Sequence, residues 1–297
     1  ADQKRGTEPL LYSILKAIPA PKAKEDEPLQ FQPSLLDYNR YVGRIGIGRI
    51  DRGKIQLGDN LVCMRLDGST TSFKVSKLFS YRGLDRIEVD SVQSGDICGI
   101  SGLPDIMVGE TVCPPSCLEA LPPLRIDEPT MKMSFGANTS PFSGKEGTLL
   151  TAQKIYERLY EESQKDVSMK FENAANNESF VVTGRGELHL SVLIETMRRE
   201  GFEIQVSKPM VITKVIDGVE YEPFEDLQID VPDEYSGAVM QLVGGRGAET
   251  VNVSSENGQT RLVYIIPSRG LISFMNQFMT LTKGYGIINH SFREYRP

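Results

Sequence analysis

Two arginine–glycine pairs stand where the sequence pattern changes from strand to helix. Arg185-Gly186 lies within VVTGRGELHL, and Arg269-Gly270 lies within YIIPSRGLIS. At such a corner a glycine can adopt a positive φ, the helix start presents free N–H groups, and an arginine suits a phosphate. In the competing interpretation each arginine pairs with a neighbouring carboxylate, and Glu187 is available to Arg185. The two interpretations are balanced for Arg269, and the ion pair is favoured for Arg185.

A second glycine-bearing segment, Ser143-Gly-Lys-Glu-Gly147, superficially resembles a phosphate-binding loop. A Walker A sequence needs a glycine, four residues and then Gly-Lys-Ser/Thr, whereas Glu146 follows the lysine here and would repel a phosphate. Ser143 and Glu146 have the spacing of a capping box, so we expect a helix to start at this point. Lys145 stays a candidate for contact with an anion from outside.

The histidines and cysteines do not predict a catalytic or metal centre. His189 and His290 are the only histidines, and neither has a cysteine at metal-ligand spacing or the partners of a Ser-His-Asp triad. We expect both to be packing or surface residues, with RNA contact as the alternative. The cysteines are expected to be structural and reduced: Cys63, Cys98, Cys113 and Cys117. No catalytic, cofactor-binding or metal-ligating residue is predicted.

Composition indicates a globular chain of two or three domains whose charge is unevenly distributed. The chain has 297 residues, 39% of them hydrophobic, with a net charge of −7 and no apolar run long enough for a membrane span. Between Lys214 and Glu234 there are eight acidic residues and one lysine. From Gly258 to Pro297 there are five basic residues and one acidic residue. A local basic face on an acidic protein can still bind phosphates.

The first 115 residues predict a short helix followed by an all-β domain. Pro9–Ile18 has helical spacing, and the prolines and charged residues that follow mark residues 1–28 as a linker. Residues 29–115 contain short apolar runs between glycine-bearing turns, which predicts a small closed β-barrel. Gly43-Arg-Ile-Gly-Ile-Gly48 is interpreted as a barrel strand whose glycines permit tight curvature, because the order is not that of a dinucleotide loop.

Residues 125–208 and 209–297 predict the same βαββαβ order twice. Helices are expected at Thr148–Gln164 and Glu187–Glu200 in the first segment, and near Tyr235–Val243 and at Leu271–Thr282 in the second. The fold class is therefore multidomain β and α+β, with a β-barrel followed by two ferredoxin-like (βαββαβ) α/β sandwich domains.

Particular stretches resemble the elongation factor G group of translational GTPases. Arg44–Leu61 resembles the opening of the second, β-barrel domain, and Gly184–Pro209 resembles the helix and last strand of domain III. Three stretches are similar to the TypA/BipA family within that group: Asn138–Gly147, the arginine–glycine form of Gly184–Leu190, and Ile266–Leu271. The resemblance covers residues 9–297.

This resemblance implies that residues 1–28 end a GTP-binding domain and that residues 29–115 are domain II. Residues 125–208 would be domain III, and residues 209–297 would be the equivalent of domain V. The implied parent is a cytoplasmic GTPase that binds the ribosome and supports large-subunit assembly and adaptation to stress or cold. The family's GTP-binding motifs have no match here, so GTP and Mg²⁺ are assigned to the parent and this chain is not expected to be catalytic.

The partner implied by the resemblance is the ribosome, chiefly the rRNA and proteins of the large subunit, bound by a monomer. Neither a membrane nor DNA is expected. The candidate contact residues are Lys145, Arg185, Arg261, Arg269, Lys283, His290 and Arg293. The alternative function is a regulatory module that senses a small ligand between the paired ferredoxin-like domains.

Overall fold

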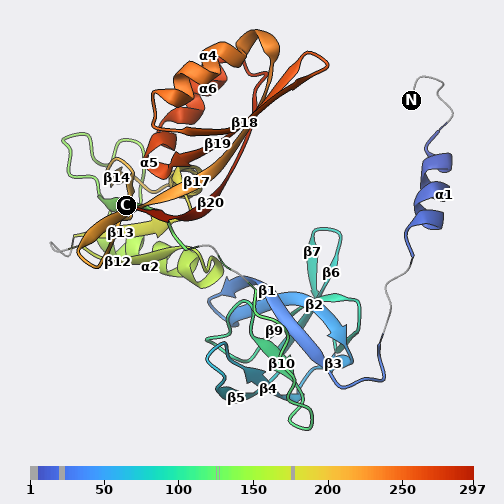
Figure 1. The fold of residues 1–297 in the computed structure, drawn as a ribbon. Helices are drawn as coiled ribbons and strands as arrows, with labels where there is room; N and C mark the ends of the chain where they lie inside the picture. Colours follow the sequence, from blue (N-terminus) through green and yellow to red (C-terminus); the bar gives the residue numbers. More distant parts are fainter. Residues whose placement is uncertain (1–5, 20–23, 125, 127, 175–177) are drawn as a thin grey trace. The chain divides into compact units, whose positions relative to one another are not determined.

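The computed structural model describes residues 6–19, 24–124, 126, 128–174 and 178–297. The chain divides into two compact units, residues 1–125 and 126–297 (Figure 1). Part of the predicted linker, residues 20–23, and the predicted domain start at residue 125 lie outside the described residues. No helix in the described ranges is long and apolar enough to span a membrane.

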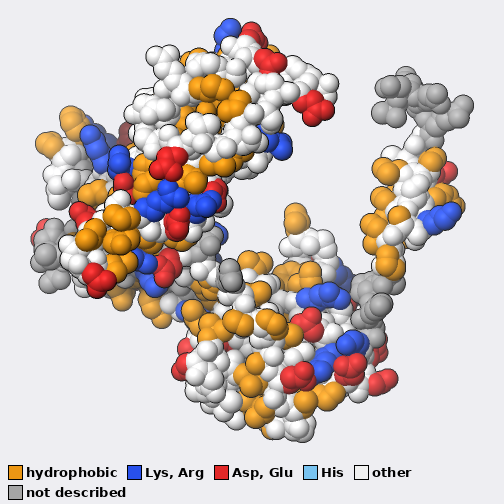
Figure 2. Space-filling model, in the orientation of Figure 1, with side chains coloured by type: hydrophobic (Ala, Val, Ile, Leu, Met, Phe, Trp, Pro, Cys, Tyr) orange, Lys and Arg blue, Asp and Glu red, His pale blue; other side chains and the backbone are white. Residues whose placement is uncertain are grey.

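The first unit holds one helix and an all-β domain. Helix α1 (Glu8–Ala17) exposes its apolar side chains, which gather along it in Figure 2. Eight strands pair in the order β5-β4-β10-β1-β2-β9-β6-β7, and β3 pairs separately with β8. The strand bounds are β1 (Gln30–Asn39), β2 (Gly43–Arg52), β3 (Lys54–Gln56), β4 (Asn60–Met64), β5 (Thr70–Lys74), β6 (Lys77–Arg82), β7 (Asp85–Glu88), β8 (Ser91–Gln93), β9 (Ile97–Ser101) and β10 (Thr111–Cys113).

The glycines of β2 allow it to approach its neighbour β1 closely. A Cβ on Gly48 would lie 2.1 Å from the backbone oxygen of Gln32, which no side chain can do. A Cβ on Gly46 would lie 2.9 Å from Cδ1 of Ile106. The segment forms the predicted strand, and the structure shows close packing as the reason for its glycines, where the sequence had suggested tight curvature.

The first ferredoxin-like domain runs from β11 to β15. Its sheet has the order β12-β13-β11-β14, and β15 also pairs with β11. The side chains of β11 that face the helices are Met131, Met133 and Phe135, and they share one core with α2 and α3. The bounds are β11 (Met131–Ala137), α2 (Ala152–Lys165), β12 (Lys170–Asn173), β13 (Ser179–Gly184), α3 (Glu187–Arg199), β14 (Ile204–Val206) and β15 (Met210–Val211).

The predicted capping box is wrong, because α2 starts later than expected. Thr151 is the N-cap of this helix, and its side chain accepts a hydrogen bond from the backbone N–H of Lys154. The preceding segment is instead held to the end of α3, where the N–H groups of Thr148 and Leu149 both donate to the carbonyl of Gly201. Because the backbone N–H groups of Thr148 and Leu149 make these contacts, the two residues do not form the first turn of α2.

The second ferredoxin-like domain runs from β16 to β20 and repeats this topology. Its sheet has the order β18-β19-β17-β20, with α4 and α6 packed together on one face (Figure 1). The predicted pair of ferredoxin-like domains is confirmed. The bounds are β16 (Lys214–Ile216), β17 (Val219–Pro232), α4 (Asp233–Gly244), β18 (Glu249–Glu256), β19 (Gln259–Pro267), α5 (Ser268–Leu271), α6 (Phe274–Leu281) and β20 (Ile287–Arg296).

The helix predicted at Leu271–Thr282 is broken into two pieces. Ser273 has a φ of 59°, in the left-handed region, and separates α5 from α6. The adjacent Ile272 packs against the core of the first ferredoxin-like domain. The single-helix prediction is therefore wrong at its start, because a contact with the neighbouring domain redirects the backbone.

Replacement of Gly48 by alanine should destabilise the β-domain by about 1–3 kcal/mol, because the added methyl group overlaps the Gln32 carbonyl. Denaturant unfolding followed by hydrogen exchange in β1 and β2 measures this effect. Gly237→Ala is the control, since nothing lies within 4 Å of its Cβ position in α4. A Gly48→Ala variant as stable as the wild type would contradict the packing argument.

Candidate functional site

The segment that resembles a phosphate loop surrounds a carboxylate of the chain itself. Glu203 accepts hydrogen bonds from the Asn138 side chain (2.6 Å) and from three backbone N–H groups within residues 144–147 (3.1 Å each). The Asn138 amide, with these N–H groups, holds the pKa of Glu203 below its ordinary value. The Nζ atom of Lys145 lies 4.7 Å from the centre of the exposed Phe142 ring. The loop thus exposes the Lys145 ammonium group and the Phe142 ring on a backbone that Glu203 holds in one conformation.

Arg185 directly follows β13, its side chain is exposed, and its backbone is held by a histidine. Its N–H donates to Nδ1 of His189 (3.2 Å), and Nε2 of that ring lies 2.6 Å from Asp166. Because Nδ1 accepts, the proton is on Nε2 and is donated to Asp166. Burial alone would raise the pKa of Asp166, but hydrogen bonds from His189 and Ser168 outweigh it and lower the pKa. His189 is therefore a packing residue, as predicted.

The ion pairs of the two arginine–glycine pairs differ from those expected. Glu187 accepts from the backbone N–H of Ser273 (2.8 Å) rather than pairing with Arg185. No ion pair of Arg185 is found in the described part of the chain. Arg269, by contrast, places Nε 2.7 Å from Glu222. The prediction that Arg185 forms an ion pair is wrong. For Arg269 the sequence left the choice open, and the structure shows an ion pair with Glu222.

The two glycines of these pairs do not occupy equivalent corners. Gly186 has a φ of 172°, which is extended backbone, and Gly270 lies inside the short helix α5. Neither glycine therefore adopts the positive φ that its residue type allows. Gly270 is required for another reason, since a Cβ there would lie 2.7 Å from the backbone oxygen of Arg246. The Arg246 side chain donates to the carbonyls of Gly270 (2.6 Å) and Ile272 (2.9 Å).

The basic C-terminal stretch is largely neutralised by the acidic strand β17, which lies between β19 and β20. Arg261 pairs with Asp230, and Arg293 pairs with Asp226, each at 2.7 Å. Arg296 binds two carboxylates, Glu249 and Glu294. On the face drawn in Figure 2, basic and acidic side chains are interspersed. The stretch is therefore a network of ion pairs rather than a field of free positive charge.

The sequence-predicted contact residues do not converge on one point. Lys145, Arg185 and Lys283 have no ion pair within the described ranges, and they stand on the 138–147 loop, the end of β13 and the turn after α6. The other four each have a carboxylate partner: Arg261, Arg269, His290 and Arg293.

Glu225 is a buried carboxylate on β17. It is 4% exposed, accepts a hydrogen bond from Oγ of Ser268 (2.7 Å) and lies 2.5 Å from Nδ1 of His290. The hydrogen bond with Glu225 raises the pKa of His290, although burial of the ring acts in the opposite direction. Alternation of buried and exposed residues along β17 is the signal that could have located Glu225 on the core face.

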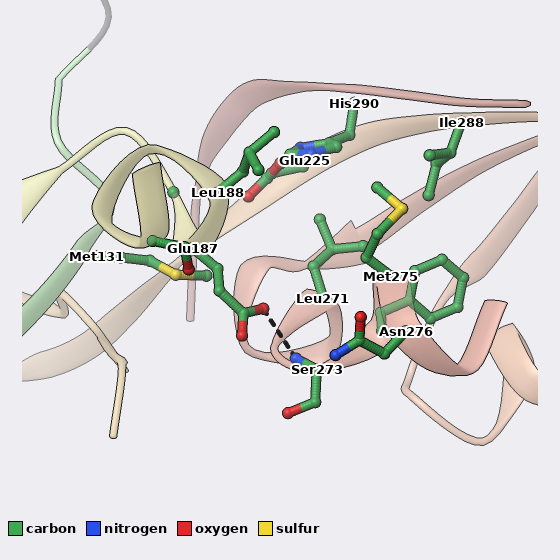
Figure 3. Close-up of a pocket in the computed structure, with 13 residues that line it drawn as sticks. Met131, Glu187, Leu188, Glu225, Leu271, Ser273, Met275, Asn276, Ile288 and His290 are labelled. Atoms are coloured by element: carbon green, nitrogen blue, oxygen red, sulfur yellow. Dashed lines mark hydrogen bonds and ion pairs between the residues drawn. The ribbon is translucent and has the colours of Figure 1, made fainter. Parts of the chain in front are cut away.

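A cavity of about 250 Å³ lies between the two ferredoxin-like domains (Figure 3). Its polar groups include the Glu225–His290 pair on the second sheet and Glu187 at the start of α3. Its apolar walls include Met131, Leu188, Leu271, Met275 and Ile288. The Glu187–Ser273 hydrogen bond, drawn dashed in Figure 3, ties the two domains together along the cavity wall.

Neither metal chemistry nor thiol chemistry is favoured by the described residues. No group of three or more His, Cys, Asp or Glu side chains among them could hold a metal ion. All four cysteines are free, and burial is the main cause that raises the pKa of Cys63 and Cys98 to about 12. Such thiols stay protonated and unreactive at neutral pH.

Two family models match separate parts of the chain. Elongation factor Tu domain 2 matches residues 43–113, which lie in the all-β domain. Elongation factor G C-terminus matches residues 219–297, which form most of the second ferredoxin-like domain. The order of these matches agrees with the fold described above.

Curated relatives match the chain over nearly its whole length. The large ribosomal subunit assembly factor BipA of Bacillus subtilis (strain 168) is 53% identical over 296 residues, which cover 99% of this chain and 48% of the relative. The factor of the same name from Synechocystis sp. (strain ATCC 27184 / PCC 6803 / Kazusa) is 44% identical over 297 residues, covering 100% of this chain and 50% of the relative. The chain thus spans about half the length of the curated relatives it matches.

A solved structure supports the fold alone. A crystal structure of a protein from Thermus thermophilus superposes with a TM-score of 0.61 at 17% identity, covering 98% of this chain and 59% of that one.

The stability of the second ferredoxin-like domain should fall as pH rises through the folded-state pKa of His290. Because that pKa is raised above the ordinary value of 6.5, the Glu225–His290 pair stabilises the fold fully below about 6.5 and progressively less at higher pH. NMR titration of the His290 ring and unfolding at several pH values measure this. His290→Gln should flatten the dependence, and a His290 pKa at or below its ordinary value would refute it.

Proposed function

This chain is a BipA-family homologue over its whole length, and on that premise we propose that it is the ribosome-contacting portion of a large-subunit assembly factor. In this proposal its partners are rRNA and proteins of the large subunit, and it acts in the cytoplasm as a monomer. Neither DNA nor a membrane takes part. A contribution to stress or cold adaptation belongs to the same proposal.

The observation that carries the proposal is the spread of identity along the chain. Identity of 53% over 296 residues extends through both units and cannot be confined to their buried cores. Shared surface residues are what a shared partner would require, since fold alone does not determine function. The relative that shares them is named for assembly of the large ribosomal subunit.

GTP hydrolysis belongs to the proposal only for a longer protein. The family resemblance assigns GTP and Mg²⁺ to a GTP-binding domain whose motifs have no match in this sequence. Within the chain, the loop that resembles a phosphate loop is engaged by Glu203, and both histidines are engaged by carboxylates. These contacts support a docking role rather than a catalytic one.

Among the candidate contact residues, the unpaired cations are the better phosphate ligands. An ion-paired arginine must leave its carboxylate before it can bind a phosphate, whereas an unpaired lysine or arginine need not. We therefore rank Lys145, Arg185 and Lys283 first. The others remain candidates that would exchange a carboxylate for a phosphate: Arg261, Arg269, His290 and Arg293.

The chain should co-sediment with isolated large ribosomal subunits and compete there with the full-length Bacillus subtilis relative. Binding should weaken as salt rises, because phosphate contacts release counterions. Charge reversal of Lys283, or of Arg185, should reduce the slope of log affinity against log salt concentration by the equivalent of about one to two phosphate contacts if that residue lies at the interface. Failure of the wild-type chain both to bind and to compete would overturn the proposed function.

The cavity favours a second candidate function, the sensing of a small ligand. It lies between paired ferredoxin-like domains and close to the start of α3, where apolar walls meet a buried carboxylate–histidine pair. An apolar cavity with a few polar groups is the usual form of a small-ligand site. A ligand there would contact both domains and so stabilise their arrangement.

Titration calorimetry with amino acids and guanine nucleotides tests this second function. A bound ligand should give heat with the wild-type chain and much less with Leu188→Trp, which fills the cavity from its exposed rim. Ser191→Ala, on the same helix, is a milder control of the cavity wall. Absence of heat with every one of these ligands would remove the second candidate.

A further inference from the structure

The first ferredoxin-like sheet has a face that no helix of its own domain covers. Helices α2 and α3 pack against β11, β12 and β13 on the face that carries Met131, Met133 and Phe135. Since side chains alternate along a strand, Lys132, Ser134 and Gly136 lie on the opposite face. We call that opposite surface the open face.

The pairing register identifies the other residues of the open face. Thr183 lies opposite Lys132 in β11 and opposite Lys170 in β12, so the two lysines flank it in one row. The two lysines are two strands apart, which is roughly 10 Å. The next two rows hold Ser134, Val181 and Glu172, and then Gly136, Ser179 and Gln205.

Small polar residues make one end of the open face concave. A hollow of about 360 Å³ is lined mostly by small or polar residues, namely Ser134, Gly136, Ala137, Thr139, Glu178, Ser179, Gln205, Val206 and Ser207. The side-chain hydroxyl of Ser134 and the side-chain amide of Gln205 can donate hydrogen bonds to a partner that comes close, whereas the hydroxyls of Thr139 and Ser207 already donate to Oε1 of Gln205 and to the carbonyl of Lys208. The hollow and the lysine row lie on the same surface.

The lysine row is the part of the open face that favours an anion. Lys132 and Lys170 form no ion pair in the described part of the chain, and the carboxylates of this face lie outside their row, Glu172 in the next row and Glu178 in the hollow. The second ferredoxin-like sheet offers a direct contrast. Its corresponding face carries Asp226 and Asp230, which bind Arg293 and Arg261 and leave no excess of positive charge.

We propose that the open face of the first ferredoxin-like sheet binds the sugar–phosphate backbone of ribosomal RNA, with Lys132 and Lys170 as phosphate ligands. This inference rests on the proposed function and specifies which surface performs it. The backbone is the expected target because no aromatic residue stands in the three rows, whereas sequence-tolerant base binding uses stacked aromatic side chains. Small hydroxyl residues suit contacts to phosphate and 2′-hydroxyl groups.

Binding of the whole chain to isolated large subunits and to protein-free large-subunit rRNA tests the inference. The double variant Lys132→Gln, Lys170→Gln should bind both more weakly, with a logarithmic salt slope smaller by about two contacts. Lys165→Gln is the matched control, because this lysine is exposed at the end of α2 on the helix side. Lys132→Arg with Lys170→Arg should keep the salt slope. Circular dichroism confirms that each variant is folded.

The possible outcomes separate the inference from the proposed function. If the glutamine variant binds subunits as the wild type does, the open face is not the contact surface, although the proposed function stands. If the wild-type chain binds subunits but not protein-free rRNA, and the variant loses subunit binding, the partner is a protein and the RNA assignment is overturned. If the wild-type chain neither binds subunits nor competes for them, the proposed function itself fails.

Discussion

A four-stranded sheet has two faces, and two helices of ordinary length can bury only one of them. Both ferredoxin-like domains of this chain obey that constraint, and the treatment of the second face decides what each can do. In the β16–β20 domain, carboxylates of β17 bind arginines from the strands on either side. In the β11–β15 domain, lysines share the face with small hydroxyl residues instead. One topology thus yields a surface whose arginines are ion-paired and a surface whose two lysines form no ion pair within the described residues.

Periodicity was sufficient to predict the two βαββαβ domains, because burial of one face imposes it locally. It was not sufficient to predict which charges meet. Acidic and basic residues are separated by tens of positions in the sequence, and the basic C-terminal face was inferred from that separation. The sheet order places β17 directly between β19 and β20, so the separated charges become neighbours. Strand order is a property of the whole domain, so the composition of a short sequence segment cannot predict which strands are neighbours.

Local motifs failed where a contact from elsewhere in the chain overrode them. Ser143 and Glu146 have capping-box spacing, yet the loop is organised by Glu203, about 60 positions away in sequence. The helix expected from Leu271 is broken at Ser273, whose N–H is bound by Glu187 of the other domain. The arginine–glycine repeat is similarly a repeat of sequence only, because one pair precedes a helix and the other lies within one.

The Glu203 loop shows why the proposed contacts with phosphate are assigned to side chains. Consecutive backbone N–H groups form a concavity that accepts any well-placed oxygen anion. Here the anion is part of the same chain and is therefore present at a high effective concentration, so an external phosphate would have to displace it. The N–H groups fix the shape of the loop and are not available to a partner. Lysines that form no ion pair within the described residues, Lys145 on this loop and Lys132 and Lys170 on the open face, are therefore the side chains that we propose to contact a polyanion.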